Sequence, residues 1–212
     1  MPNPNSVLQP AFSAAADRNK QPILEILQQV LPTTGRALEI ASGTGQHVTW
    51  FAQHMPQWIW QPTDADAPAL NSIDTRIAQG QLANVCAPLL LDVLSPVWLP
   101  GDAAAFDAVY CANMLHIAPW ATCSALMQGV ARHLTASGML ITYGPYLEDE
   151  VPTPSGNLGF DHDLRLQNPA WGIRRREDVE LEAAKAGLRL AQRFAMPANN
   201  LLLVWERSST EA

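Results

Sequence analysis

The segment from Arg36 to Met55 constrains the fold more than any other part of the chain. Residues 36–41 have the apolar pattern of a short buried strand, and they lead directly into the turn Ser42-Gly43-Thr44-Gly45. The residues after the turn share one face of a predicted helix, which carries Val48, Phe51, Ala52 and Met55. A strand, a glycine turn and a helix in this order are typical of the first half of a parallel β-α-β unit.

The same alternation continues along the chain. Strand patterns occur at residues 58–61, 88–91, 106–112, 138–143, 188–195 and 200–205, and helical patterns at 67–78, 119–134 and 177–186. A further helix precedes the first strand, with Asn19 placed as its N-cap and Pro22 in its first turn. The last two strands have no helix between them, so they form a hairpin. The sequence therefore predicts an α/β fold with a doubly wound, mostly parallel seven-stranded sheet and a C-terminal antiparallel hairpin, which differs from the usual dinucleotide-binding topology.

Length and composition favour a single domain over residues 1–212, because 48% hydrophobic residues can supply one substantial core. Residues 1–12 include a stretch rich in Asn, Pro and Ser, and we expect them to form a mobile tail. The tail lacks the basic start and the apolar stretch of a secretory signal. Every unbroken apolar run is far shorter than the roughly 20 residues that cross a bilayer. We therefore expect a cytoplasmic protein without a membrane segment.

Charge and cysteine usage argue against several kinds of partner. A formal net charge of −7 would repel phosphate backbones, so we do not expect nucleic acid as a partner. The three cysteines lack CxxC spacing, which argues against a disulfide framework and a structural zinc site. His47 and His54 lie two turns apart on one predicted helix, but acidic residues are only scattered elsewhere, so no metal is expected. The oligomeric state is left open.

The stretch from Gly144 to Gly172 is too long for a plain connector. It is rich in Pro, Gly and Asn, and it also carries aromatic and charged side chains. Loops of more than about 15 residues in compact domains are usually functional or disordered. We expect this stretch to form a lid-like insertion on the substrate side.

The glycine turn is the predicted cofactor site, because open α/β sheets bind ligands at the carboxyl ends of their strands. Its glycines allow close approach of the backbone, and the next helix offers free N–H groups. Asp64 follows about 20 residues later, at the spacing of an acid that binds ribose hydroxyls, and Asp66 is a close rival. Val48 replaces the third glycine of a pyrophosphate-binding turn, and Glu39 lies inside the strand; both features favour S-adenosylmethionine over NAD. The alternative is that the glycines only shape a tight turn.

The string Glu39-x-Ala41-x-Gly43-x-Gly45 resembles the first motif of the Rossmann-like class I methyltransferases. Seven strings from Arg18 onward are similar to the family called methyltransferase-like protein twenty-six: LEIASGTGQH, WQPTDAD, NMLHIAPW, TYGPY, FDHDLR, WGIR and MPANN. The resemblance implies S-adenosylmethionine as the cofactor, with Asp64 holding its ribose and Asp92 near its adenine. It also implies that Arg18 and Asn19 cover the cofactor. The cofactor-binding residues expected in this way are Asn19, Glu39, Ala41, Ser42, Gly43, Gly45, Asp64, Asp92 and Asn113.

Methyl transfer depends mainly on holding the acceptor in place, so a strong base is optional. Asn113 and His116 follow the fourth strand, from which proteins of this superfamily often address the acceptor, and His116 could accept a proton. Tyr143 ends the fifth strand, and Asp161 and His162 form a carboxylate–imidazole pair in the lid-like insertion. These five are the predicted catalytic residues. Each has a structural alternative, as a cap, a packed side chain or an anchor of the insertion.

The predicted function is methylation, by S-adenosylmethionine, of an unidentified small or medium-sized polar molecule. Arg174 could clamp an acidic acceptor, although a run of three arginines is usually a solvated face. The chain lacks a string such as Asn-Pro-Pro-Tyr that would identify the acceptor, so a non-catalytic S-adenosylmethionine sensor or subunit is the alternative. A nicotinamide-dependent oxidoreductase is disfavoured by Val48 and by the terminal hairpin.

Overall fold

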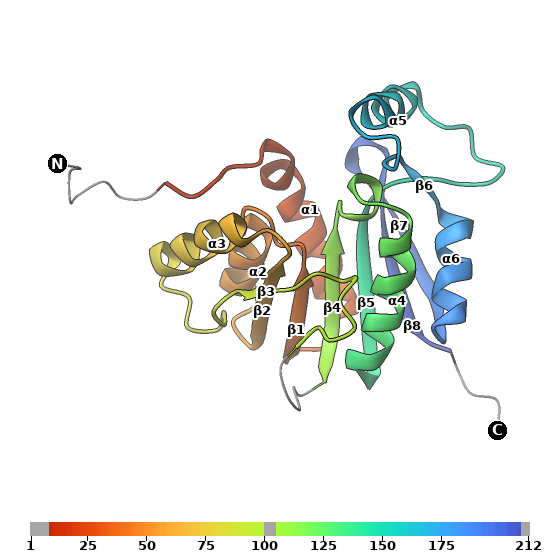
Figure 1. Cartoon of the computed structure of the whole chain (residues 1–212). Helices are drawn as coiled ribbons and strands as arrows, with labels where there is room; N and C mark the ends of the chain where they lie inside the picture. The colour runs from red at the N-terminus through yellow and green to blue at the C-terminus, as the bar shows by residue number, and fades with distance from the viewer. Residues whose placement is uncertain (1–8, 100–104, 209–212) are drawn as a thin grey trace.

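The computed structural model describes residues 9–99 and 105–208, in which helices surround a central sheet (Figure 1). The helices are α1 (Ala14–Val30), α2 (Gln46–His54), α3 (Ala67–Gly80), α4 (Ala121–His133), α5 (Ser155–Gln167) and α6 (Arg176–Lys185), with the short 3-10 helices η1 (Leu115–Ile117) and η2 (Pro197–Asn199). The strands are β1 (Gly35–Ile40), β2 (Trp58–Asp64), β3 (Leu89–Leu90), β4 (Phe106–Ala112), β5 (Leu134–Leu147), β6 (Arg174–Arg175), β7 (Leu188–Met196) and β8 (Asn200–Arg207).

The strands follow the order β3-β2-β1-β4-β5-β8-β7 across the sheet. Neighbouring strands from β3 to β5 are parallel, whereas β8 is antiparallel to both β5 and β7. The predicted mostly parallel sheet with a C-terminal antiparallel hairpin is therefore confirmed. The two-residue strand β6, which the sequence did not indicate, pairs with the last residues of β5.

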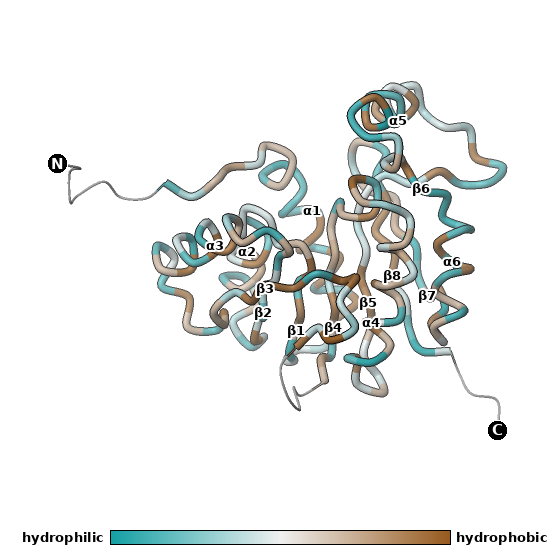
Figure 2. The backbone as a smooth tube through the Cα atoms, viewed as in Figure 1, coloured by the Kyte–Doolittle hydropathy of each residue, from teal (hydrophilic) through white to brown (hydrophobic). Residues whose placement is uncertain are grey.

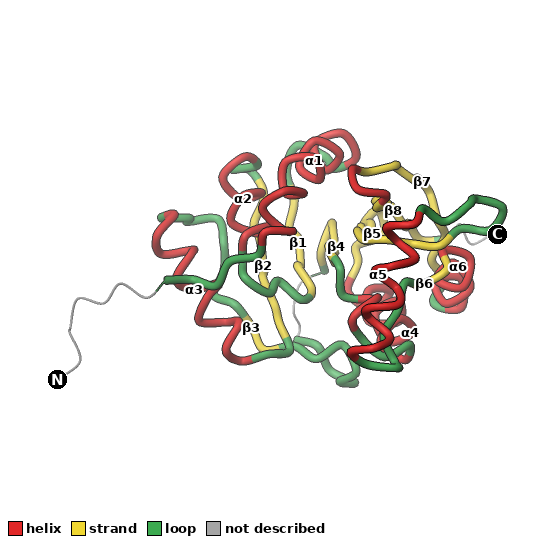
Figure 3. Tube along the Cα trace, turned by 90° about the horizontal axis from the view of Figure 1, so that it is seen from above, coloured by secondary structure: helices red, strands yellow, loops and turns green. Residues whose placement is uncertain are grey.

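The sheet is covered on both faces (Figure 3). Successive side chains of a strand point to opposite faces. Accordingly, Ala37 packs in the core formed with α1, α2 and α3, whereas Leu38 packs in the core formed with α4 and α6. Hydrophobic segments concentrate in the strands, while much of α6 is hydrophilic (Figure 2). Within the described ranges, no helix combines the length and the apolar character needed to span a membrane.

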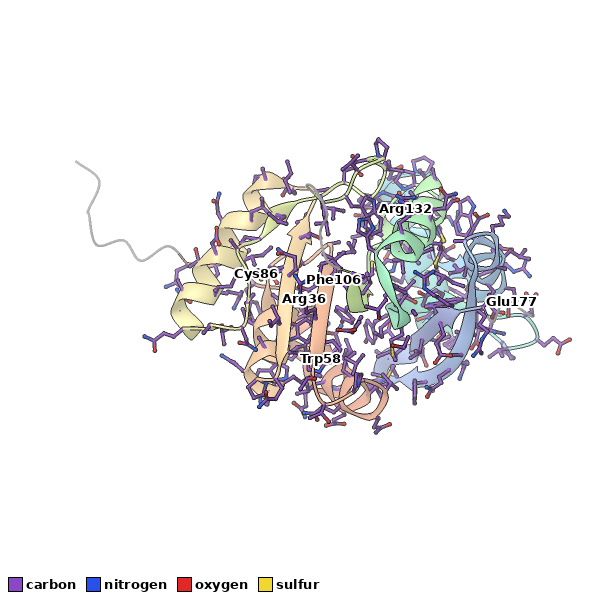
Figure 4. The ribbon with its side chains drawn as sticks, turned by 90° about the horizontal axis from the view of Figure 1, so that it is seen from below. Arg36, Trp58, Cys86, Phe106, Arg132 and Glu177 are labelled. Atoms are coloured by element: carbon purple, nitrogen blue, oxygen red, sulfur yellow. The ribbon has the colours of Figure 1, made fainter. Side chains whose placement is uncertain are left out.

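Figure 4 looks onto the edge of the sheet at the amino ends of the parallel strands, where Arg36, Trp58 and Phe106 lie. The guanidinium carbon of Arg36 lies 5.4 Å from the centre of the Phe106 ring, and the backbone N–H of Arg36 donates to Asp107 at 2.9 Å. A Cβ at Gly35 would lie only 2.7 Å from the Trp58 ring, so this position needs glycine. The glycine turn and the ends of β1, β2 and β4 lie at the opposite edge, where α5 is also found (Figure 1).

The N-terminal helix differs from the sequence-based prediction. Helix α1 starts at Ala14 and is capped by Ser13, whose side chain accepts a hydrogen bond from Ala16 N–H at 3.2 Å, so Asn19 is not the N-cap. Pro22 lies inside the helix and not in its first turn. Of the predicted mobile tail, residues 1–8 lie outside the described residues. Ala11, also assigned to the tail, is fixed by backbone hydrogen bonds to the side chains of Ser72 and Arg76.

The predicted insertion, residues 144–172, is mostly regular structure. Strand β5 continues to Leu147, and helix α5 occupies Ser155–Gln167. Gly156 and Gly159 lower the helix propensity of this segment, which is why its sequence resembles a loop. The segment does lie at the carboxyl edge of the sheet, as expected, with α5 over the ends of the central strands (Figure 3).

Candidate functional site

The glycine turn after β1 holds three residues in the left-handed region of backbone space. Ala41 has φ +56°, Gly43 +55° and Gly45 +77°. The two glycines serve different purposes: a Cβ at Gly43 would meet nothing within 4 Å, whereas a Cβ at Gly45 would lie 3.0 Å from the Cα of Ile73 in α3. Gly45 is thus needed for helix packing, and Gly43 leaves an open face of backbone. Ala41 carries a side chain in a conformation that costs about 1 kcal/mol or more, a type of strain that clusters at ligand sites.

Hydrogen bonds join the glycine turn to the end of β2. Ser42 N–H donates to the Thr63 carbonyl at 2.8 Å, and Thr63 N–H donates to the Ser42 hydroxyl at 3.2 Å. Asp64 accepts from Gly43 N–H at 2.7 Å through one carboxylate oxygen and from Asp66 N–H at 2.9 Å through the other. The structure therefore brings Asp64 to the turn, whereas the rival Asp66 is an exposed residue at the start of α3.

Glu39 is a buried acid beside this turn, with 1% of its surface exposed. Its Oε2 has no hydrogen-bond partner in the described structure. Burial raises the pKa of Glu39 to about 8; the hydrogen bond from Ser42 opposes this shift, and the nearby charge of Asp64 adds to it. A buried carboxylate oxygen without a partner is costly unless a ligand or solvent satisfies it. Glu39 is therefore the strongest indication that the turn binds a polar ligand.

Asp92 lies at the same edge, one strand further out. Leu91 N–H donates to the backbone carbonyl of Asp64 at 2.8 Å, which places the residue after it next to the end of β2. The Asp92 side chain is exposed and accepts from Leu94 N–H at 2.9 Å. The Asp92 carboxylate stabilises the turn that follows it through this hydrogen bond, and it also faces solvent. Asp92 therefore lies at the rim of the site.

The ends of β4 and β5 bring Asn113, His116 and Gly144 together. Asn113 has φ +59°, and its N–H donates to the Tyr143 carbonyl at 2.7 Å. A Cβ at Gly144 would lie 3.4 Å from His116 Nδ1 and 3.5 Å from Asn113 Oδ1, so both side chains contact the end of β5. Burial, with a smaller effect of Arg174, lowers the pKa of His116 to about 4. Its imidazole is therefore neutral at pH 7.

Asn19 is linked to a buried network that sequence reasoning did not find. Its Oδ1 lies 2.6 Å from His47 Nε2, and His47 Nδ1 lies 3.4 Å from the Tyr110 hydroxyl. Because an amide oxygen only accepts, Nε2 is the protonated nitrogen of His47. Burial raises the pKa of the Tyr143 phenol, and the nearby side chains of Asn19 and Asn200 oppose this shift.

A sequence signal for this network did exist. His47 and Tyr110 stand at positions whose neighbours in the helix and strand patterns are apolar, and Asn200 ends the MPANN string. Burial lowers the pKa of His47 to about 4, and Lys20 lowers it further. His47 is therefore a neutral imidazole whose two ring nitrogens contact Asn19 and Tyr110. In the ranges 9–99 and 105–208, no group of three His, Cys, Asp or Glu side chains is arranged to hold a metal.

The residues of the insertion make structural contacts. Asp161 accepts from Arg165 Nε at 2.8 Å and from Ile173 N–H at 2.7 Å, and His162 is exposed on α5. Arg174 donates to the backbone carbonyls of Leu115, Ala118 and Ala170 at 2.9, 2.6 and 2.8 Å. Asp161 and Arg174 thus anchor the insertion, and a role of Asp161 and His162 at an acceptor stays a prediction. The aromatic ring from the insertion that reaches the site is Phe160, 5.6 Å from the His116 ring.

The chain matches one protein family and is similar in structure to several solved methyltransferases. A family model described as "Protein of unknown function (DUF938)" matches residues 10–207. Similar solved structures include the mitomycin 7-O-methyltransferase MmcR (TM-score 0.78, 15% identity, 92% of this chain and 56% of that chain). An O-methyltransferase family protein from Burkholderia thailandensis has a TM-score of 0.75 and 17% identity over 93% of this chain and 60% of that chain.

A third similar structure is CalO1, a methyltransferase in calicheamicin biosynthesis, in its SAH-bound form (TM-score 0.73, 17% identity, 92% of this chain and 54% of that chain). At these identities the likeness shows a shared methyltransferase fold. The present chain spans only about half to three fifths of the length of these proteins.

Proposed function

The chain belongs to the DUF938 family, whose description names no activity, and we propose from its own site that it is an S-adenosylmethionine-dependent methyltransferase acting on a small or medium-sized polar acceptor. The resemblance to methyltransferase-like protein twenty-six is part of this proposal. The unpartnered Oε2 of buried Glu39, beside the open backbone of Gly43, is the observation that carries it.

The residues at the turn fit this cofactor. Glu39, once it releases its proton, offers a carboxylate to a cationic amino group, and a Cβ at Gly43 would meet nothing within 4 Å, so a ligand can approach the backbone there. Asp64 accepts one backbone N–H through each oxygen, and each oxygen has a further lone pair for ribose hydroxyls. Asp92 would extend the site at its rim, and Asn19 would close it from α1. When bound, the cofactor supplies a methyl group already activated on a sulfonium.

The acceptor side is built from neutral groups. Asn113 and Tyr143 supply hydrogen-bonding side chains at the ends of β4 and β5, and they orient the acceptor. His116 is neutral at pH 7 and can therefore take a proton from an acceptor hydroxyl or amine. Its low pKa makes it a weak base, which suits a reaction in which positioning supplies most of the rate enhancement.

Ligand-dependent stabilisation tests the proposal. A ligand that binds only the folded state at one hundred times its Kd stabilises it by about 2.7 kcal/mol. For a domain of this size that raises the melting temperature by roughly 5–10 °C. We expect this shift with S-adenosylmethionine and its demethylated product and none with NAD. Stabilisation by NAD alone would overturn the proposal.

The alternative function is a non-catalytic S-adenosylmethionine sensor or subunit. One observation favours it: Asp161, the predicted acid of the insertion, accepts hydrogen bonds from Arg165 and from Ile173 N–H. These bonds occupy the carboxylate that is predicted to act on an acceptor. Transfer of a labelled methyl group to any small molecule in a cell extract, lost in an Asp64→Ala variant, would decide for the enzyme. Binding of the demethylated cofactor without any transfer would decide for the sensor.

A further inference from the structure

We propose that a cavity of about 200 Å³ between the β5–α5 connector and the β7–β8 turn binds the acceptor, and that the acceptor is a small neutral molecule with a hydroxyl group. This inference rests on the proposed methyltransferase function and identifies its substrate class. Cavities for drug-sized ligands measure roughly 300–1,000 Å³. The cavity therefore suits a compact molecule of about one ring.

Apolar side chains line two sides of the cavity. Two prolines and a valine of the connector form one side, and side chains of β7 and β8 form the other; these residues are Val151, Pro152, Pro154, Ala195, Met196 and Leu201. The valine side chain is 52% exposed although it is apolar. An apolar ligand surface placed between the two walls would remove this area from water, which favours binding.

The charged residues of the cavity neutralise each other. Glu148 and Arg193 both line it, and Arg193 Nε donates to Glu148 at 2.8 Å as part of a two-point ion pair. Arg176 also contacts Glu148 at 2.9 Å, and hydrogen bonding to Arg193 lowers the pKa of Glu148. An ionic ligand would have to compete with this pairing, whereas a neutral one would not. The lining thus selects against acids and amines.

Amide side chains supply the recognition. Asn157 Nδ2 donates to the Asn199 carbonyl at 3.1 Å, which joins α5 to the β7–β8 turn. Ala198 and Asn199 both have positive φ, +58° and +56°, so the turn is held in a strained conformation. Asn200, the residue that follows the turn, also lines the cavity. An amide can donate to and accept from a hydroxyl, which suits an alcohol or a phenol.

Asn200 also connects the cavity to the acceptor-side residues. It lines the cavity, and its side chain is close enough to the Tyr143 phenol to affect the pKa of that group. In the sheet it lies opposite Pro145, the residue after Gly144, where the Asn113 and His116 side chains converge. A hydroxyl held by Asn200 would therefore lie near the groups that orient the acceptor and accept its proton.

Saturation-transfer NMR on the full chain, with the demethylated cofactor present, tests this inference with three probes of similar size: phenol, benzoate and benzylamine. We expect saturation of phenol at least three times that of either ion. Asn200→Ala should reduce the phenol signal several-fold, and Ala195→Phe, which fills the cavity, should abolish it. Gln192→Phe is the matched control, because Gln192 lies exposed on the same strand outside the cavity lining.

Calorimetry separates this inference from the proposed function. We expect the Kd of the demethylated cofactor to change less than about threefold in the Ala195→Phe variant. Absence of cofactor binding to the unmodified chain would refute the proposed function itself. If the demethylated cofactor binds normally, the proposed function stands, and the acceptor site is refuted by any one of three NMR results. These are no signal from phenol, saturation of benzoate or benzylamine equal to that of phenol, and the same phenol signal in Ala195→Phe as in Gln192→Phe.

Discussion

Replacing Glu39 by Gln should change how stability depends on pH. The folded chain holds the Glu39 carboxyl buried, with a pKa near 8 instead of 4.5. Between these values the folded state binds a proton that the unfolded state has released, so stability falls as pH rises. Below pH 4.5 both states are protonated and the effect vanishes. Above pH 8 the cost is complete, at roughly 5 kcal/mol for the whole shift at about 1.4 kcal/mol per unit.

The two buried histidines give the opposite slope. Their pKa values are lowered from 6.5 to about 4, so the unfolded chain takes up protons first as pH falls, and stability is lost below pH 6.5. Taken together, Glu39, His47 and His116 should give the folded chain its highest unfolding free energy near pH 6.5. Between pH 6.5 and 8, Glu39 alone should cost about 2 kcal/mol, or roughly 4–8 °C in melting temperature.

Urea unfolding at several pH values measures the effect. The unfolding free energy of Glu39→Gln, minus that of the unmodified chain, should rise by about 2 kcal/mol from pH 6.5 to 8. Asp66→Asn is the control, because it removes an exposed carboxylate and should give no such trend. A difference that stays constant with pH would show that Glu39 is not held protonated in the folded chain.

Three further predictions concern the same region. Gly45→Ala should lower the unfolding free energy by about 2–4 kcal/mol, since its Cβ meets Ile73 and its φ is positive, and Gly43→Ala by only about 1–2 kcal/mol. Equal losses in urea titrations would contradict the division of roles between the two glycines. Asp64→Ala should weaken binding of the demethylated cofactor by about 1–3 kcal/mol, measured by calorimetry, and Asp66→Ala should leave it unchanged. His47→Leu removes the contacts of His47 with Asn19 and Tyr110 and should speed hydrogen exchange in α1; unchanged exchange would exclude His47 as the anchor of α1.

The fold could be predicted from sequence because it follows from local patterns. Apolar strand and helix periods alternate clearly, and the absence of a helix between the last two strands requires the antiparallel hairpin. The sequence-based prediction differs from the structure where helix propensity is weak or where two nearby residues can both cap a helix. The two glycines of α5 make its sequence resemble a loop. Ser13 has the same capping chemistry as Asn19, so the sequence predicts a later start for α1 than the structure shows.

The cofactor side of the site was predictable and the acceptor side much less so. Asp64 and the glycine turn meet because parallel strands bring their carboxyl ends to one edge of the sheet. The number of residues between the turn and Asp64 is therefore enough to predict their contact. Asn200 reaches Tyr143 only because β8 runs antiparallel to β5, which brings together residues 57 positions apart. No periodicity encodes such a contact. The side-chain hydrogen bonds that engage Asp161 are equally invisible in a strand and helix pattern.

Asn19 joins the two halves of the proposed site. Its oxygen accepts from His47 in the first turn of α2, next to the glycine turn, and its side chain is close enough to Tyr143 at the end of β5 to affect the pKa of that phenol. A ligand that moves α1 must therefore change contacts on both sides at once. Binding free energies couple reciprocally, so a cofactor that fixes α1 should strengthen acceptor binding by the same factor as the acceptor strengthens cofactor binding. Apolar side chains could fill this position without any hydrogen-bonding requirement, but they would not specify a single position of α1 relative to α2 and β5.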